Sequence, residues 1–179
     1  LALGPLEPRL PGRLRHRDRR IQLAPAIYQR DLARLDRALA APRGDALILI
    51  GRRNLRSNNS WMHNSLRLVK GKPRCTLLMH PDDARARGLA EGALARLASP
   101  VGAVEVPVEL TTDLMPGVVS LPHGWGHHRP GARLAVAAAH AGVSMNDVID
   151  PACVDELTGT AVLAGQAVTV AAAAAGAVA

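Results

Sequence analysis

Residues 46–64 read ALILIGRRNLRSNNSWMHN, a short apolar run followed by a dense polar one. The run 46–50 ends at Gly51, which is typical of a buried strand that leads into a loop. The loop 51–64 holds three arginines, four asparagines and two serines. Such donors and small polar groups suit phosphates and polar heterocycles. We therefore predict that the rest of the chain builds a barrel that presents this loop to a ligand.

The composition indicates one domain with an aliphatic core. The chain has 179 residues, which is enough for a single core. Phe is absent and the aromatic residues are Tyr28, Trp61 and Trp125, so the core should consist of Leu, Val, Ile and Ala. Cys75 and Cys153 lie too far apart for a metal-binding pair, and we expect both to be buried structural residues.

The chain begins with Leu rather than Met, which suggests a fragment or a processed product. No apolar run approaches the roughly 20 residues that a membrane helix needs. The basic opening residues lack the apolar core of a secretory signal. A reduced, cytoplasmic setting is therefore the default expectation.

The net charge of +7 is unevenly distributed. Residues 1–74 contain 17 basic and 5 acidic side chains, whereas residues 75–179 contain 5 and 10. One basic end suggests an anionic partner, although a solvated arm is the better explanation for the isolated arginines. The basic segment has no interleaved aromatic residues, which argues against binding of single-stranded nucleic acid. A basic nucleic-acid-binding module stays open as an alternative.

The hydrophobic pattern predicts a mainly β chain with short helices, an α+β fold built as a small mixed barrel. Clean alternation at 104–110 indicates a half-buried strand, in which Pro107 should lie at an edge or a kink. We expect an extended basic arm at 1–25, a barrel domain at 26–170 and a flexible Ala-rich tail at 171–179. The predicted strands are 46–50, 75–79, 93–98, 104–110, 118–121 and a pair within 160–170. The predicted helices are 26–41, 61–69, 80–88 and 132–142.

Histidines and serines in the loops invite enzyme interpretations that their spacing does not favour. The histidines at 63, 80, 123, 127 and 128 form no helical pair with a glutamate. The glycines of the loop 122–128 allow a tight turn whose histidines bond backbone, which is as good an explanation as a shared ligand. Ser57 and Ser60 lack a nearby constellation of a histidine with a carboxylate, so a nucleophilic hydrolase is not favoured. Ligand binding is the interpretation that remains.

Several motifs, in order, resemble the C-terminal molybdopterin dinucleotide-binding domain of the bis-guanine-dinucleotide molybdenum or tungsten oxidoreductases. This family includes formate dehydrogenases, nitrate reductases and dimethyl sulfoxide reductase. The resemblance spans residues 21–170, and the segment 56–64 is most similar to formate-dehydrogenase-like members. The matching motifs are Gly51-Arg52 after the apolar run, HPDDA at 80–84, GLAEG at 88–92, SPVG at 99–102, VEVPVEL at 104–110, MPGVVSLPHGWGH at 115–127, Asn146 and Thr158-Gly159.

This resemblance implies a double-psi β-barrel that holds one side of a bis(molybdopterin guanine dinucleotide) cofactor carrying Mo or W. The loop 51–59 would take the pterin and diphosphate, with residues 123–127 along the pterin and Asn146 assisting. The two loops would form a clamp in which Arg52, Arg56 and Asn59 converge on one cleft with His123. The implied cofactor-binding residues are Gly51, Arg52, Arg53, Leu55, Arg56, Ser57, Asn58, Asn59, His123, Gly124, Trp125, His127 and Asn146.

The chain also departs from a complete member of that family. It has no iron–sulfur cysteine set and no residue that can be named as the metal's protein ligand, both of which the family carries in earlier domains. We therefore name no catalytic or metal-binding residue and do not expect this chain alone to catalyse a reaction. The implied partners are upstream domains of the same polypeptide, which would hold any iron–sulfur cluster, and the parent would be formate-dehydrogenase-like. The alternative is a barrel that forms an independent subunit, which formylmethanofuran dehydrogenases exemplify.

Overall fold

The computed structural model describes residues 4–42 and 44–174. Contacts divide the chain into two units, Leu1–Pro42 and Arg43–Ala179, and each is described by itself. The first unit contains helix α1 (Ala26–Ala40), which has no buried residue. This division falls after Pro42, whereas the sequence analysis put the boundary after residue 25. No helix among the described residues is long and apolar enough to cross a membrane.

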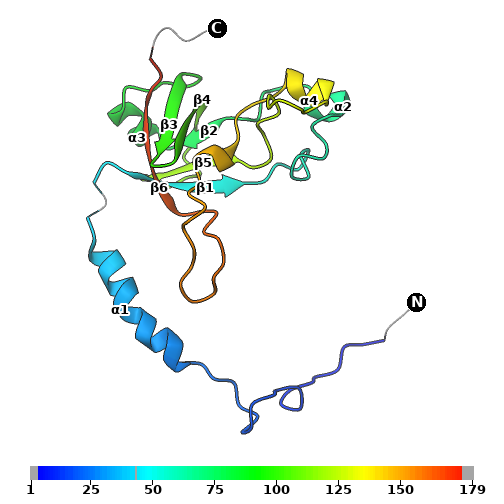
Figure 1. The fold of residues 1–179 in the computed structure, drawn as a ribbon, viewed down its shortest axis with the longest axis vertical. Coiled ribbons are helices and arrows are strands. Elements are labelled where there is room, and N and C mark those ends of the chain that lie inside the picture. Colours follow the sequence, from blue (N-terminus) through cyan, green and yellow to red (C-terminus); the bar gives the residue numbers. More distant parts are fainter. Residues whose placement is uncertain (1–3, 43, 175–179) are drawn as a thin grey trace. The chain divides into compact units, whose positions relative to one another are not determined.

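The second unit is a closed barrel of six strands (Figure 1). The hydrogen-bonded order around it is β1-β5-β2-β4-β3-β6. The pairs β1/β5 and β2/β4 are parallel, and the other neighbours are antiparallel. The predicted double-psi β-barrel is confirmed. The strands are β1 (Leu47–Arg52), β2 (Leu77–Met79), β3 (Leu94–Ser99), β4 (Gly102–Leu110), β5 (Val118–Pro122) and β6 (Gln166–Ala172).

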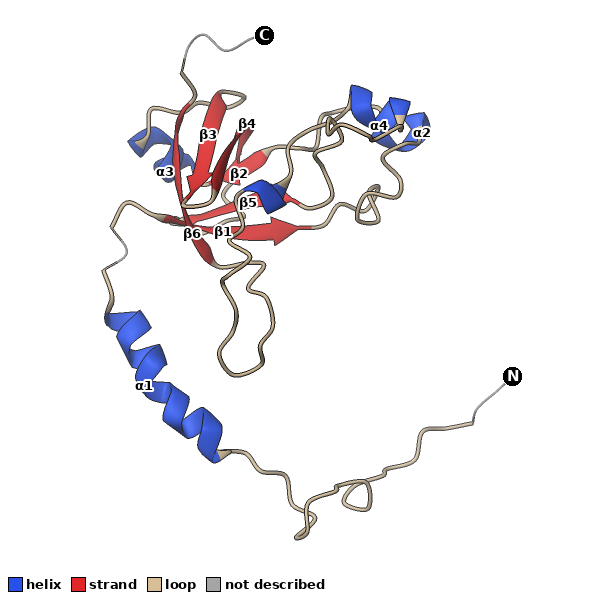
Figure 2. Ribbon diagram, viewed as in Figure 1, coloured by secondary structure: helices blue, strands red, loops and turns tan. Residues whose placement is uncertain are grey.

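Short helices interrupt the barrel strands (Figure 2). They are α2 (Leu66–Val69), α3 (Pro81–Ala86), α4 (Ala135–Ala139) and the 3₁₀ turn η1 (Met145–Asp147). The predicted start of α3 is confirmed, since Pro81 opens the helix and the His80 side chain accepts from the Asp82 amide. The helices predicted at 61–69 and 132–142 form over only part of those ranges, because residues 61–64 adopt turns and residues 132–134 and 140–142 are not helical.

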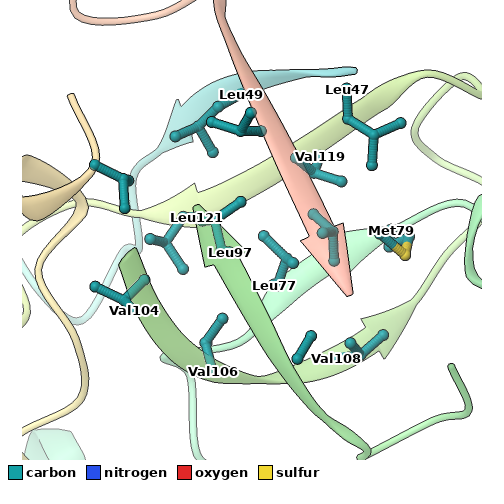
Figure 3. Close-up of a cluster of buried hydrophobic side chains, with 14 of the residues drawn as sticks. Leu47, Leu49, Leu77, Met79, Leu97, Val104, Val106, Val108, Val119 and Leu121 are labelled. Atoms are coloured by element: carbon teal, nitrogen blue, oxygen red, sulfur yellow. The ribbon is translucent and has the colours of Figure 1, made fainter. Parts of the chain in front are cut away.

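The core is aliphatic, as predicted, and fills the barrel (Figure 3). In β4, Val104, Val106 and Val108 are buried while Glu105 and Pro107 face outwards. The Val108 amide donates to the Ala93 carbonyl on the β3 side, so position 107 would direct an N–H towards β2. Pairing with β2 begins only at Val108, which is why a proline is tolerated there.

The last strand differs from its prediction. In place of a strand pair at 160–170, the structure has the single strand β6 and one isolated bridge between Val154 and Ala161. β6 continues through Ala172, into the predicted flexible tail, because Ala171 and Ala172 pair with β3. Residues 175–179 of that tail lie outside the described residues. The two cysteines are half-buried rather than buried.

Candidate functional site

Two polar loops leave the barrel side by side. β1 and β5 are parallel, and their last residues, Arg52 and Pro122, are register partners. The His123 amide donates to the Arg52 carbonyl at 3.0 Å. Since parallel strands end at the same edge, the loops 53–65 and 123–134 emerge together, at the kind of edge where ligands bind in sheet-based folds. We call residues 53–65 and 123–128 the clamp.

A buried histidine joins the two halves of the clamp. His63 Nδ1 lies 2.7 Å from His127 Nε2, and His63 Nε2 lies 2.8 Å from Ser57 Oγ. The His63 and Ser57 residues are each only 1% exposed. The Trp125 ring packs on the His63 ring, with centroids 4.0 Å apart and planes tilted by 32°. These contacts fix the position of the first clamp loop relative to the second.

Both histidines of this bridge are held neutral. Burial lowers the pKa of His63 to about 4, and the nearby His127 and Arg74 act in the same direction. Burial also lowers the pKa of His127, with a further contribution from His128. A neutral imidazole donates once and accepts once, so His63 donates to one of its two partners and accepts from the other.

The Ser57–His63 contact is structural rather than catalytic. A nucleophilic serine needs access to substrate and a base that a third group orients. Ser57 is buried, and the third group here is His127 rather than a carboxylate. The sequence analysis missed the histidine beside Ser57, because the contact forms only when residues 58–62 fold back as turns. It also placed Ser57 among ligand donors, whereas the structure engages its hydroxyl with His63.

The clamp closes through a close backbone contact. Asn58 and Asn59 both adopt left-handed backbone angles, with φ of 41° and 64°, which asparagine tolerates better than most residues. Their turn brings the Asn59 carbonyl against Gly124, where an added Cβ would lie 2.1 Å from that oxygen. Gly124 itself has φ of +92°. Glycine is therefore required at the point where the loops touch.

An open hollow of about 620 Å³ lies on the first loop. The Arg53 guanidinium donates to Asn59 Oδ1, which leaves the amide N–H groups of Asn59 free to face a ligand. Asn54 Nδ2 is buried and has no hydrogen-bond partner among the residues described. Four of the predicted residues line this hollow, together with Asn54 and Met62, which the sequence analysis left out. The lining is Arg53, Asn54, Leu55, Asn58, Asn59 and Met62.

The Arg52 side chain makes its hydrogen bonds within the barrel and does not line the clamp hollow. The predicted convergence of Arg52, Arg56 and Asn59 with His123 is therefore not observed. The Arg52 guanidinium donates to the Ser120 carbonyl at 2.5 Å and to the Thr76 carbonyl at 2.7 Å. Burial lowers its pKa, against the opposing charge of Glu109. Arg53 lies beyond the end of β1 and is exposed, whereas Arg52 is half-buried. Arg56 and His123 also lie outside the lining of the hollow.

Replacing Arg52 by lysine should destabilise the barrel by about 1–2 kcal/mol, because one ammonium cannot reproduce the fork that reaches both β5 and Thr76. Arg53→Lys, at the exposed next position, is the matched control and should change the stability little. Urea denaturation of both variants measures the difference. Equal stabilities would show that the Arg52 contacts contribute nothing.

Asn146 also lies away from the first hollow. It is exposed in η1 and lines a separate hollow with Ile149, Pro151, Ala161 and Leu163. Gly51 connects β1 to that region, since its Cα faces Met145, with 3.3 Å between an added Cβ and the Met145 sulfur. Gly51 therefore contacts η1, the turn that carries Asn146, and neither residue lines the clamp hollow.

Asn64 is a further residue that the sequence analysis missed. Its Oδ1 accepts from the backbone amides of Val136 and Ala137, at 3.1 and 3.2 Å, and so caps the first turn of α4. An asparagine 72 residues before a helix gives no local sign of this role. Among the described residues, no group of three or more His, Cys, Asp or Glu side chains is placed to hold a metal ion.

A family profile described as "Molydopterin dinucleotide binding domain" matches residues 47–166, which include strands β1 to β5 and both clamp loops. The chain belongs to this family. The dinucleotide-binding domain identified in this way begins at β1 and ends at the start of β6, so the match does not include the basic segment 1–25.

Curated relatives of this domain are long reductase chains. The chain is 36% identical over 66 residues to a tetrathionate reductase chain of Salmonella typhimurium, covering 37% of the chain and 6% of the relative. It is 29% identical over 115 residues to ArrA, the molybdopterin-containing subunit of the arsenate respiratory reductase of Chrysiogenes arsenatis, covering 62% and 14%. A dimethyl sulfoxide/trimethylamine N-oxide reductase of Rhodobacter capsulatus is 41% identical over 56 residues, covering 31% and 7%. The chain thus spans a small fraction of each relative.

A solved structure has the same fold as the domain. Acetylene hydratase from Pelobacter acetylenicus superposes with a TM-score of 0.60 at 20% identity, covering 80% of this chain and 20% of that one. At this identity the likeness concerns the fold alone.

Proposed function

We propose that the clamp holds one side of a bis(molybdopterin guanine dinucleotide) cofactor within a larger molybdenum or tungsten oxidoreductase. The observation that carries this proposal is the hollow at the end of two parallel strands, which combines the Arg53 cation with three asparagines, among them Asn54 with its unpartnered amide. An unpaired buried donor costs about 1–3 kcal/mol, and rotating that amide towards a ligand oxygen would recover the bond. The family assignment favours this function over nucleic-acid binding.

The lining of the hollow fits the parts of such a dinucleotide. Arg53 would bind the diphosphate, because guanidinium is a forked donor for phosphate oxygens. Asn54, Asn58 and Asn59 would donate to phosphate or to the edge of a heterocycle. Leu55, which is 98% exposed, and Met62 would cover a planar ring. The bound cofactor supplies the two-electron redox chemistry, and these residues bind and orient it.

Four further predicted residues, Ser57, Gly124, Trp125 and His127, would act by fixing this geometry. Ser57, His127 and Trp125 hold His63 and so set the distance between the loops. Gly124 allows the loops to touch. A rigid supporting layer of this kind preorganises a site and lowers the entropy lost on binding.

We further propose a formate-dehydrogenase-like parent enzyme, which rests on the similarity of residues 56–64. The names of the curated relatives above describe them as reductases of tetrathionate, of arsenate, and of dimethyl sulfoxide or trimethylamine N-oxide. Formate oxidation and tetrathionate reduction assays on the full-length enzyme would discriminate these activities. A parent that reduces an oxyanion and leaves formate unchanged would contradict the finer assignment.

Binding of the cofactor can be tested on the 179-residue chain by anaerobic calorimetry with metal-free molybdopterin guanine dinucleotide, and with GDP as a probe of its nucleotide half. We expect Arg53→Met and Asn54→Leu each to weaken binding of both ligands about tenfold, which corresponds to the loss of one charged or buried hydrogen bond. Arg67→Met is the matched control, because Arg67 is exposed on α2 and lies outside the hollow.

Two results would contradict this proposal. In the first, the chain binds neither the dinucleotide nor GDP. In the second, Arg53→Met and Arg67→Met weaken binding equally, which would reduce the effect to net charge. Circular dichroism of each variant establishes that the barrel is intact before the affinities are compared.

A further inference from the structure

A second hollow, separate from the clamp hollow, lies beside α2 and the segment that follows α4. Its volume is about 370 Å³, larger than the roughly 150 Å³ apolar cavity that holds a benzene ring in another protein. Most of its wall is carbon, contributed by Val69, Pro73, Pro107, Ala139 and Ala141. A hollow of this size with apolar walls and few polar groups is typical of small-molecule sites.

One cation faces this hollow without a carboxylate partner. The Arg74 guanidinium lines the wall and donates to the Leu68 carbonyl at 3.0 Å and the Lys70 carbonyl at 3.2 Å. None of the ion pairs formed by the described residues includes Arg74. The neighbouring Lys72 is already paired with Glu109 at 2.8 Å. Carbonyl oxygens solvate a guanidinium but do not neutralise it, so the hollow favours an anion.

Two residues that line the same hollow, Cys75 and Trp125, can report whether a ligand occupies it. Cys75 lines it, and its sulfur accepts from the Val143 amide at 3.3 Å. Burial raises the pKa of this thiol, so its reaction with alkylating reagents is slow and depends on access. Trp125 also lines the hollow, and its ring packs on His63 of the clamp. Occupancy should therefore change both the Cys75 reactivity and the Trp125 fluorescence.

We propose that this hollow is a second ligand site, which binds a small aromatic carboxylate. The ring lies against the carbon walls and the carboxylate pairs with Arg74. The site is distinct from the proposed cofactor site, since the two hollows have no lining residue in common. Its occupant would touch Trp125, and through that ring it would contact the buried bridge of the clamp.

The test uses the chain with Trp61→Phe and Cys153→Ser, in which Trp125 is the sole tryptophan and Cys75 the sole cysteine. Benzoate is the probe and benzamide its neutral counterpart of the same shape. We expect benzoate to change the Trp125 fluorescence saturably, to slow the alkylation of Cys75 by iodoacetamide, and to bind about tenfold more tightly than benzamide.

Matched variants separate the charge from the cavity. Arg74→Met should weaken benzoate binding about tenfold and leave benzamide unchanged, whereas Arg67→Met on the exposed side of α2 should change neither. Ala141→Leu fills the hollow without altering charge and should abolish binding of both probes. Absence of a saturable signal, alkylation of Cys75 at the same rate with benzoate, or equal affinity for benzoate and benzamide would overturn the proposal. The comparison of benzoate with benzamide does not use the Arg74 variant, so it tests the proposal even if that variant fails to fold.

Discussion

Gly124→Ala is expected to destabilise the barrel unit by about 3 kcal/mol or more and to open the clamp. Two costs add at this position. A left-handed backbone angle costs a residue with a Cβ about 1–2 kcal/mol, and Gly124 has φ of +92°. The new methyl group would also meet the Asn59 carbonyl at 2.1 Å, and overpacking of this kind costs about 1–3 kcal/mol. Neither the Asn59 backbone nor Gly124 can give way without moving a loop.

Gly131→Ala is the matched control for this substitution. Gly131 has φ of +90°, nearly the same as Gly124, but an added Cβ would meet nothing within 4 Å. It should therefore carry the backbone cost alone, about 1–2 kcal/mol. Urea denaturation monitored by circular dichroism measures both variants, and the difference isolates the contact between the loops. Equal losses of stability in the two variants would show that the loops do not touch at Gly124.

The barrel could be predicted from sequence because its signals are local. The alternation of residues 104–110 indicates a strand and the face it buries, and the apolar run 46–50 before Gly51 indicates a buried strand, both without knowledge of any partner. The start of α3 is equally local, since Pro81 and two acids lie within one turn. β6 was harder, because the Ala-rich residues 171–172 carry no pattern of their own. They form strand only where β3 pairs with them.

The candidate site was predicted only at the level of its loops. The density of polar residues in 51–64 indicated a ligand loop, and parallel pairing of β1 with β5 explains why 123–127 lies beside it. The individual roles depend on side-chain direction, which alternation and turns decide. Arg52 points to the Ser120 carbonyl, and His63 turns inwards to bridge Ser57 and His127. Composition alone treats Arg52, Arg53 and His63 as equivalent hydrogen-bonding residues. In the fold, Arg53 lines the hollow, whereas Arg52 and His63 make contacts within the protein.

Stability is expected to fall by about 2 kcal/mol between pH 7 and pH 5 because of His63. The folded pKa of His63 is about 4, below the ordinary histidine value of 6.5. A lowered histidine pKa means that the folded state binds fewer protons than the unfolded state. Its contribution is therefore complete above pH 6.5 and is lost as the pH falls from 6.5 towards 4, reaching about 3 kcal/mol. The lowered pKa of His127 adds a loss of the same sign.

Carboxylates contribute in a different pH window. The pKa of Glu109 is lowered by hydrogen bonds from Lys72 and Thr76, so its contribution is present above the ordinary glutamate value of 4.5 and is lost below it. Between pH 6.5 and pH 5 the histidine bridge should therefore dominate the change. Burial is the main cause of the lowered His63 pKa, His127 and Arg74 lower that pKa further, and only the hydrogen bond with the Gly124 backbone raises it. No acid is among these groups.

His63→Gln tests this assignment, because glutamine can donate and accept but does not titrate. The variant should be less stable than the parent chain at pH 7.5, since its amide cannot reproduce both bonds and the stack with Trp125, and its stability should change less between pH 7 and pH 5. His140→Gln, which replaces an exposed histidine on the segment after α4, controls for the loss of one histidine per chain. Urea denaturation at pH 7.5, 6.5, 5.5 and 5.0 measures how the free energy of unfolding of each variant and of the parent chain changes with pH. If the stability of His63→Gln depends on pH as strongly as that of the parent chain, protonation of His63 does not cause the loss of stability at low pH. The Asn59–Gly124 contact would then be what holds the clamp together.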